Sequence, residues 1–266
     1  MIGMTISTQK NMNNNLPIIT NTLTPNVRVF FSQRGEVIPN DDYSSFNICN
    51  YTGDSEEHIL YCRNRLCDYL NIPLSNLITP RQTHSLNVKI IDSTTINSSE
   101  LENVDALVTN LSDVAIAVNT ADCVPVLLAD NNAGVIAAIH SGWKGTVGKI
   151  SAKAIECMLS LGATPQAIKA FIGVSICPEC FEVGDEVVEQ FRIAFPHVPE
   201  IIINSQPRCH INLQQACRQT LIDCGLHPKN IILSNICSRC NPNTYFSARR
   251  MGINSGRTLS GIIISK

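Results

Sequence analysis

The sequence predicts an α/β fold in which mixed sheets and flanking helices form a single domain. Three observations support this prediction. A chain of 266 residues can bury a full hydrophobic core. Short apolar runs typical of strands alternate along the chain with helical patterns. No internal repeat and no low-complexity linker divides the chain. We therefore expect one domain over residues 27–266, preceded at 1–26 by a poorly ordered lead-in or an edge strand.

The first third of the chain carries clear start and stop signals. Residues 27–31 alternate as a strand does, and Asp54 or Ser55 is a suitable N-cap for a helix with an acidic first turn. In order, we expect a strand at 27–31, a short strand or loop at 44–47, a helix at 55–70, a strand at 88–91 and a loop at 92–103.

Residues 105–146 organise the rest of the chain. Apolar strands are expected at 114–118, 124–128 and 135–139, and a Gly-rich corner at 141–145 opens a helix. Cys123 and His140 therefore lie near strand ends, where the backbone holds side chains rigidly. A thiolate and an imidazole placed in this way form either a metal-binding pair or a nucleophile–base pair.

The remaining elements follow from periodicity and from glycine stop signals. Apolar residues step by three and four from Val147 to Leu161 and indicate an amphipathic helix that Gly162 ends. Beyond it we expect a strand at 170–176, a turn at 177–180, helices at 182–194 and 211–224, a strand at 230–236, a loop at 237–240, and strands at 245–249 and 261–264.

Composition excludes several classes of protein. The net charge is −2 and no block of like charges is present, so nothing favours binding to nucleic acid or to a membrane surface. No apolar run approaches the ~20 residues that a membrane span needs, and the first 26 residues do not resemble a secretory signal. Twelve cysteines without an export signal indicate a reducing compartment. We expect a cytoplasmic protein.

His84 is the third candidate ligand, because it precedes the strand expected at 88–91. One thiolate and two imidazoles, from Cys123, His84 and His140, suit Zn²⁺ and leave a fourth position open for water or substrate. Asp122, next to the thiolate, could orient a ligand or move a proton. The alternative is a buried cysteine with two unrelated histidines, and spacing alone does not decide between these interpretations.

Two CxxC pairs, Cys177/Cys180 and Cys237/Cys240, need a separate interpretation. The halves of a four-cysteine zinc site are usually ~15–20 residues apart, which is much less than the distance between these pairs. They could still converge, because each follows an expected strand. Neither opens a helix in the way that a thioredoxin-like dithiol does. A second metal site and ordinary adjacent thiols both remain open.

Basic residues in Gly- or Ser-containing corners are candidates for binding an anion such as phosphate. Lys144 lies in the corner after His140, and Arg249 lies in a Ser-Ala-Arg-Arg segment. Arg34 follows the expected strand at 27–31. The simpler interpretation of each is ordinary surface charge.

These residues together make the chain resemble the laccase-domain (YfiH-like) family over most of its length, from about Val27 onwards. The glutamine–histidine, Ala-Asp-Cys and His-Ser-Gly-Trp elements, in that order, are specific to the family. The matching segments are 31–35 (FSQRG), 46–47 (FN), 64–65 (NR), 82–84 (QTH), 105–109 (DALVT), 120–123 (TADC), 140–145 (HSGWKG), 181–184 (FEVG), 246–250 (FSARR) and 256–257 (GR).

The resemblance implies a layered α/β/β/α sandwich similar to cysteine-hydrolase-like folds. It places the zinc ligands at His84, Cys123 and His140, the set that ligand chemistry also selects. The family is described as multicopper polyphenol oxidase, as purine nucleoside phosphorylase with adenosine deaminase activity, and in part as peptidoglycan editing factor.

The expected cofactor is therefore zinc rather than copper, and the expected partners are a small-molecule nucleoside and phosphate. Phosphorolysis of adenosine, inosine and methylthioadenosine and deamination of adenosine are the implied reactions. His84, Cys123, His140 and Asp122 are the expected catalytic residues. The expected substrate-binding residues are Arg34, Asn47, Lys144 and Arg249. The sequence does not indicate an oligomeric state.

Three other functions stay open. Cys123 could be a nucleophile with His140 as its base, in a hydrolase that cuts an amide of a cell-wall peptide precursor. A copper-dependent polyphenol oxidase is disfavoured, because a mononuclear and a trinuclear copper centre together need more imidazoles than the six histidines present. A zinc-bearing interaction domain without catalysis is the third.

Overall fold

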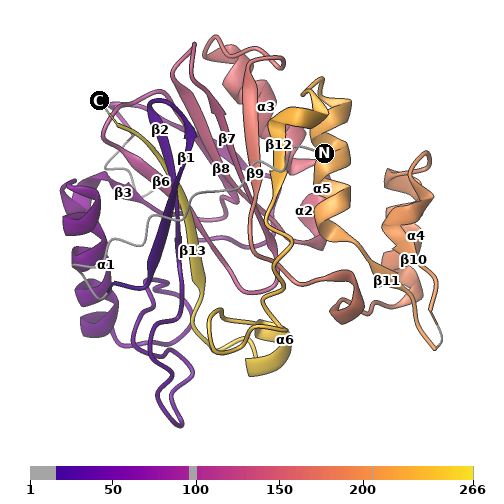
Figure 1. Ribbon diagram of the computed structural model, residues 1–266, viewed down its shortest axis with the longest axis horizontal. Coiled ribbons are helices and arrows are strands. Elements are labelled where there is room, and N and C mark those ends of the chain that lie inside the picture. The colour runs from indigo at the N-terminus through magenta and orange to yellow at the C-terminus, as the bar shows by residue number, and fades with distance from the viewer. Residues whose placement is uncertain (1–15, 96–100, 206, 266) are drawn as a thin grey trace.

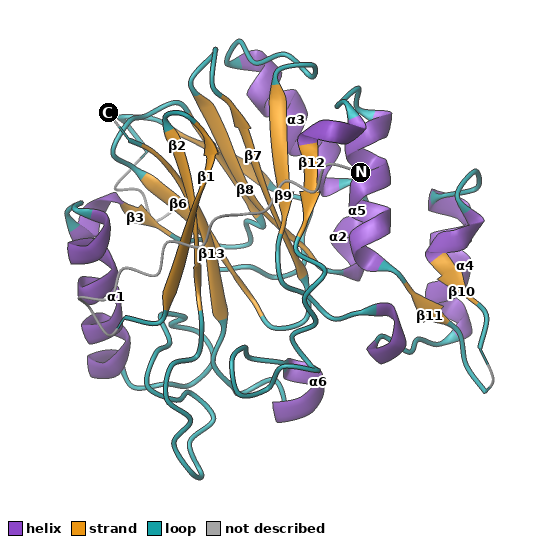
Figure 2. Ribbon diagram, viewed as in Figure 1, coloured by secondary structure: helices purple, strands orange, loops and turns teal. Residues whose placement is uncertain are grey.

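The computed structural model describes residues 16–95, 101–205 and 207–265. Two sheets face each other, and helices cover both outer faces (Figure 1, Figure 2). Helix α1 (Glu56–Leu70) packs on one sheet, while α3 (Ile150–Ser160) and α5 (Leu213–Asp223) pack on the other. The chain is therefore a single-domain α/β/β/α sandwich with mixed sheets, as the sequence predicts.

The five-stranded sheet is built from both ends of the chain. Its order is β1 (Ile18–Thr24), β2 (Val27–Ser32), β13 (Thr258–Ile264), β6 (Ala115–Thr120) and β3 (Leu77–Ile78). All pairs are antiparallel except β3 with β6. The strand β1 lies at the edge of this sheet. Of the segment expected as a lead-in, residues 1–15 lie outside the described residues.

The six-stranded sheet carries the candidate ligands at its strand ends. Its order is β12 (Ile231–Leu233), β9 (Ile168–Ile172), β7 (Val124–Asp130), β8 (Val135–Ser141), β5 (Ala106–Thr109) and β4 (Val88–Ile91). Strands β9 and β12 run parallel, with Leu233 opposite Ile172. Because these parallel strands end opposite each other, the segments that follow them leave the sheet side by side, at its carboxyl end.

Alternating side chains divide the core into three parts. In β2, Phe31 packs between the sheets and Phe30 packs beneath α1. In β7, Leu127 lies between the sheets and Leu128 lies beneath α3 and α5. Successive side chains of a strand point to opposite faces, and here both faces are covered. This explains why the central strands read as continuous apolar runs instead of alternating with polar residues.

Helix α1 starts and stops where local chemistry predicts. The Ser55 hydroxyl accepts a hydrogen bond from the His58 N–H and caps α1, and Asn71 ends that helix in the left-handed conformation with a φ of 58°. The other helices are α2 (Trp143–Val147), α4 (Asp185–Ala194) and α6 (Ala248–Met251). Short elements complete the described chain: 3₁₀ turns η1 (Leu74–Asn76), η2 (Pro178–Cys180), η3 (Pro199–Ile201) and η4 (Pro228–Asn230), and strands β10 (Ile202–Ile203) and β11 (His210–Ile211).

Several sequence predictions of local structure are wrong in type or in extent. The helix expected from Val147 to Leu161 begins only at Ile150, as α3, because Lys149 adopts a left-handed φ of 58° and separates it from α2. The segment expected as a strand at 245–249 is instead a loop as far as Ser247, followed by the first two residues of α6. The strands expected at 170–176 and 230–236 end early, at Ile172 and Leu233. Opposite Gly173 stands Pro125, whose carbonyl accepts the Gly173 N–H but which has no N–H to return the second bond of the pair.

Within the three described ranges, none of the helices combines the length and the apolar character that crossing a bilayer requires.

Candidate metal centre

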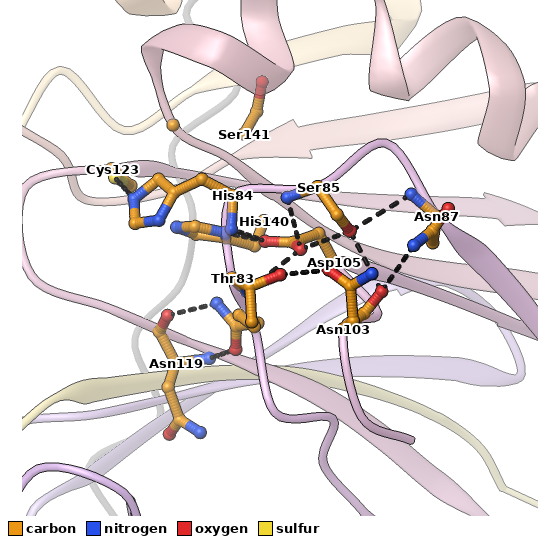
Figure 3. Close-up of polar contacts among 12 residues, drawn as sticks. Thr83, His84, Ser85, Asn87, Asn103, Asp105, Asn119, Cys123, His140 and Ser141 are labelled. Carbon is orange, nitrogen blue, oxygen red and sulfur yellow. Dashed lines mark hydrogen bonds and ion pairs between the residues drawn. The ribbon is translucent and has the colours of Figure 1, made fainter. Parts of the chain in front are cut away.

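The structure brings His84, Cys123 and His140 together at one edge of the six-stranded sheet (Figure 3). Their candidate ligand atoms all lie within 4.8 Å of one another. Cys123 immediately precedes β7, and His140 lies near the end of the neighbouring antiparallel strand β8. His84 belongs to the loop between β3 and β4. The three side chains that the sequence selected therefore form one cluster.

Strand alternation aims the cluster inward. In β8, Ile136 and Ala138 pack between the two sheets, and His140 continues that two-residue step. The His140 side chain is consequently buried, with 4% of its surface exposed, although it ends a strand. His84 lies on the loop between β3 and β4 and is exposed. The cluster thus has a buried side and a side open to solvent.

The donor atoms fit a tetrahedral zinc ion. Zinc bonds of ~2.3 Å to sulfur and ~2.0–2.1 Å to nitrogen, at a tetrahedral angle, place the two donors about 3.6 Å apart. The Cys123 Sγ lies 3.6 Å from the His84 Nε2. Asp105 occupies the His140 Nδ1, which leaves Nε2 as the free nitrogen of that ring. One thiolate and two imidazoles leave a fourth position for water or substrate.

Asp105 is the residue that holds the cluster in place (Figure 3). Its Oδ1 accepts hydrogen bonds from the His140 Nδ1 at 2.7 Å and from the His84 backbone N–H at 3.1 Å. Its Oδ2 accepts from the N–H groups of Thr83 and Ser85 and from the Ser85 hydroxyl. One fully buried carboxylate therefore orients one ligand through its ring and another through its backbone.

The same contacts set the charges of the cluster. Burial alone would raise the pKa of the Cys123 thiol, but the charge and hydrogen bond of His140, with a hydrogen bond from His84, lower it to about 6. Burial would lower the pKa of His140, whereas the Cys123 thiolate and Asp105 raise it to about 9. Metals and electrophiles react with the thiolate, so the site favours the form of Cys123 that both require.

Gly142 makes room for the cluster. A Cβ at this position would lie 2.7 Å from the His84 Cδ2 and 3.0 Å from the Cys123 Sγ. The first distance is too short for unbonded atoms and the second is unusually tight, so a side chain at position 142 would shift the His84 ring and crowd the Cys123 sulfur. This gives a physical reason for the glycine in the His-Ser-Gly-Trp element.

Asp122 bonds to residues outside the three-residue cluster and anchors the turn before Cys123. Its Oδ1 accepts from the Ser238 hydroxyl and its Oδ2 from the Arg249 backbone N–H, each at 2.6 Å. Its backbone has a φ of 87°, which is unfavourable for a residue with a Cβ. Both carboxylate oxygens are thus engaged in holding a strained turn directly before the thiolate.

Two of the expected substrate-binding residues are buried and bonded within the protein. The Arg34 guanidinium donates to the Ser44 hydroxyl and to Pro242 O and lies over the Phe246 ring. Burial lowers its pKa, against the charges of nearby acidic residues. The Asn47 amide donates to the Asp54 carboxylate and accepts from the Arg257 backbone N–H. These contacts tie loops together.

The other two expected substrate-binding residues are exposed. Lys144 lies in the first turn of α2, with its Nζ 5.7 Å from the centre of the Trp143 ring. The Arg249 guanidinium lies over the Phe181 ring and donates to Glu182 O, while its backbone bonds to Asp122. The backbone of Arg249 is therefore hydrogen-bonded to Asp122, the residue that precedes Cys123 in the chain.

Sequence reasoning assigned no role to Asp105, Gln82 or Ser238. The Gln82 amide pairs with the backbone N–H and C=O of Asn119 and fixes the His84 loop to β6. The sequence features that could have pointed to Asp105 and Gln82 are indirect. Asp105 stands directly before an apolar strand, and Gln82 stands two residues before a candidate ligand.

The layered sandwich and the cluster at its strand ends define the class of this protein: an α/β enzyme with a candidate metal centre. More particularly, the chain belongs to the family described as multi-copper polyphenol oxidoreductase laccase, whose model matches residues 28–265. The resemblance seen in the sequence is thereby confirmed.

Curated relatives match nearly the whole chain. The protein named adenosine deaminase RL5, from an unknown prokaryotic organism, is 46% identical over 244 residues, which cover 89% of this chain and 93% of the relative. A protein of Bacteroides thetaiotaomicron named purine nucleoside phosphorylase is 36% identical over 250 residues, which cover 91% of this chain and 93% of that one.

Solved structures share the fold. The crystal structure of YlmD from Geobacillus stearothermophilus superposes with a TM-score of 0.88 at 24% sequence identity, over 98% of this chain and all of that one. The Bacillus licheniformis protein YfiH gives a TM-score of 0.87 at the same identity, over 95% of this chain and 98% of that one. At this identity the comparison establishes the architecture alone.

Proposed function

We propose that this chain is a zinc-dependent purine nucleoside enzyme. In this proposal it deaminates adenosine and phosphorolyses adenosine, inosine and methylthioadenosine. The observation that carries the proposal is the cluster of His84, Cys123 and His140, which offers three donors at zinc-binding spacing and leaves one position open. The names of the relatives supply the substrate class.

The residues have distinct roles in this proposal. Asp105 holds His140 in the tautomer that presents Nε2, and it fixes the loop that carries His84. Asp122 holds the turn that presents the Cys123 sulfur. When bound, zinc would lower the pKa of a water at its fourth position toward ~7. Deamination then adds water to the purine C6 and releases ammonia.

Phosphorolysis needs a cation for the phosphate. Arg249 and Lys144 are exposed, and the backbone N–H of Arg249 bonds to Asp122, the residue before Cys123. We assign the phosphate to Arg249 first, because a guanidinium binds phosphate through two parallel hydrogen bonds. In the proposal Arg34 and Asn47 support the surrounding loops, since their polar groups are buried and bonded within the protein. The Arg249 guanidinium is exposed, and its hydrogen bonds to Glu182 O are long, at 3.3 and 3.4 Å.

The direct test is incubation of the zinc-loaded protein with adenosine, with and without phosphate, followed by separation of the products. Inosine in both reactions, with adenine and ribose 1-phosphate only when phosphate is present, is the expected result. An Arg249→Ala variant should lose phosphorolysis and keep deamination. If neither adenine nor inosine forms at full zinc occupancy, the proposal is wrong.

One observation favours a second candidate function. Cys123, His140 and Asp105 also have the order of a nucleophile, a base and an orienting carboxylate, and the pKa of Cys123 is lowered to about 6. Such a set could hydrolyse an amide of a cell-wall peptide precursor through a thioester on Cys123. Covalent trapping of Cys123 by a substrate analogue in metal-free protein, with activity that survives chelation, would favour this hydrolase.

Copper oxidase chemistry and a non-catalytic role are tested by the same protein preparations. Among the described residues, the candidate metal clusters contain two histidines in total, His84 and His140. Diphenol oxidation that needs copper and disappears in Cys123→Ala would support the oxidase. Equal turnover of nucleosides by the wild type and a His84→Ala variant would support an interaction domain.

A further inference from the structure

Four cysteines form a second cluster at the end of two neighbouring strands. Strands β9 and β12 run side by side in parallel, and Cys177 and Cys237 each lie a few residues beyond the end of one of them. Ser175 and Cys237 form an isolated parallel bridge that extends this pairing past the sheet. The parallel pairing therefore brings together two CxxC pairs that the sequence places far apart.

The four sulfurs have the spacing of a single tetrahedral ion. All four lie within 4.8 Å of one another, and the Sγ atoms of Cys180 and Cys240 are 3.5 Å apart. Four zinc–sulfur bonds of ~2.3 Å at tetrahedral angles place the sulfurs about 3.8 Å apart. A disulfide needs ~2.05 Å, and all four of these cysteines are free. A four-iron cluster needs a wider separation between its cysteine sulfurs than a single ion does.

Hydrogen-bond donors point at the sulfurs. The Cys177 backbone N–H lies 3.2 Å from the Cys237 Sγ, and the Arg239 Nη1 lies 3.3 Å from the Cys180 Sγ. Donors of this kind offset the negative charge that four thiolates concentrate around a dication. Arg239 is held between two ligands of its own CxxC pair, so its charge stays near the cluster.

We propose that Cys177, Cys180, Cys237 and Cys240 bind a structural zinc ion that is separate from the candidate catalytic centre. Four thiolates fill the coordination sphere and leave no position for a substrate, which is the arrangement of structural zinc sites. The ion joins the segment after β9 to the segment after β12. This proposal goes beyond the proposed nucleoside chemistry and does not depend on that chemistry.

The second site also positions the first. Ser238 lies between two of the four cysteines, and its hydroxyl donates to the Asp122 carboxylate at 2.6 Å. Asp122 directly precedes Cys123 and holds a left-handed φ of 87°. The Ser238 N–H bonds to Ser175 O, so its position follows from the pairing of the two segments. A zinc ion that fixes this loop therefore fixes the turn that presents Cys123.

Metal content tests the proposal without any activity measurement. Protein purified under reducing conditions with zinc should contain two equivalents of zinc per chain. A His84→Ala/Cys123→Ala variant should keep one, and a Cys180→Ser/Cys240→Ser variant should also keep one. Cobalt bound to the first variant should show the visible absorption of a tetrahedral tetrathiolate site. These variants separate a failure of this proposal from a failure of the proposed function.

A matched control is Cys157→Ser, which removes a partly exposed cysteine outside both clusters. It should keep both equivalents and the wild-type melting temperature. The Cys180→Ser/Cys240→Ser variant should melt about 5 °C or more below it, because a structural ion contributes to folding. Should that variant aggregate, the His84→Ala/Cys123→Ala protein still decides the matter. Iron in place of zinc, a disulfide between the pairs, or no metal in that protein would each overturn the proposal.

Discussion

The two cysteine-containing clusters lie beyond strands of the same sheet and differ in what completes them. The cluster of Cys123, His84 and His140 has three donors and one exposed side. The cluster of Cys177, Cys180, Cys237 and Cys240 has four donors of one kind. With three ligands an ion keeps a position for chemistry, and with four it does not. Number of donors, more than location, separates a candidate catalytic centre from a structural one.

The supports of the two clusters differ as well. Asp105, a fully buried carboxylate, holds the three-ligand cluster through a ring nitrogen and successive backbone N–H groups. The four-cysteine cluster depends on backbone pairing and on the exposed Arg239. We therefore expect the first cluster to be sensitive to a single buried charge and the second to be sensitive to loss of its thiolates.

The largest expected effect follows removal of Cys123, the thiolate of the proposed catalytic centre. Cys123→Ala should lower turnover of adenosine by several orders of magnitude and remove one equivalent of zinc, because only two imidazoles remain. The melting temperature should change little. Turnover and zinc content of the purified variant check this. Loss of both zinc equivalents from Cys123→Ala would show that the two clusters are not independent.

Chelation should distinguish the clusters by the order in which they lose metal. The three-ligand site has an open position and an exposed ligand, His84, where a chelator can attack. Four thiolates must be displaced one by one from the other site. Dialysis against EDTA, with zinc content and turnover measured over time, should remove activity with the first equivalent. Added zinc should restore it. Simultaneous release of both equivalents would contradict the comparison.

Asp105→Asn should weaken zinc binding at the three-ligand site roughly 10–100-fold, the usual effect of losing a carboxylate that orients a histidine ligand. Binding at the four cysteines should not change. Competition with a chromophoric chelator measures both affinities in one titration. An unchanged affinity at the first site would show that the loop around His84 is positioned by other contacts.

Acidification should reveal the contribution of Asp105 to stability. Burial would raise the pKa of Asp105, but His140 and Ser85 lower it from 3.8 to about 2. Because the pKa of Asp105 is lower in the folded than in the unfolded protein, the ionised carboxylate stabilises the fold. This stabilisation is complete well above pH 3.8 and is lost as the pH falls through the folded-state pKa of about 2. The full effect is on the order of 2 kcal/mol.

Urea unfolding of metal-free wild type and Asp105→Asn, from pH 6 to pH 3, checks this expectation. The difference in free energy of unfolding between the two proteins should be largest at pH 6 and should shrink below pH 4. A difference that stays constant over the whole range would mean that the asparagine costs stability through packing alone.

The smallest expected effect concerns the contact between the clusters. Ser238→Ala removes the hydroxyl that bonds to Asp122 and should lower kcat about threefold to tenfold, as one lost hydrogen bond of ~1 kcal/mol implies. Both zinc equivalents should remain. Ser234→Ala, in the same segment but outside this contact, is the control. A wild-type kcat in Ser238→Ala would show that the four-cysteine cluster does not influence the proposed catalytic centre through this hydrogen bond.

Much of the fold could be predicted from sequence, because long apolar runs mark strands covered on both faces. The candidate ligands could be selected too, since Cys123 and His140 lie at the open end of one β-hairpin, whose two strands are adjacent. Asp105 could not, because its role exists only when the loop at His84 packs against it. The segment at 245–249 reads as a strand, yet Arg249 gives its N–H to Asp122 instead of a sheet. Such tertiary contacts override local propensity.

The convergence of the two CxxC pairs illustrates the same limit. Spacing between Cys180 and Cys237 exceeds that of compact zinc motifs, so sequence left two interpretations open. The parallel register of β9 and β12 decides where both pairs go. Pairing between strands that are so far apart in the sequence is a property of the whole sheet, and no local sequence pattern predicts it.

Asp105 has a further consequence for how the enzyme matures. Its partners lie 21 residues before it, at His84, and 35 residues after it, at His140, so the carboxylate closes two long loops at once. Contacts of this range form after local structure during folding. A nascent or partly unfolded chain would thus lack this binding site for the ion. Metal binding at His84, Cys123 and His140 would then occur only after the two sheets have packed together.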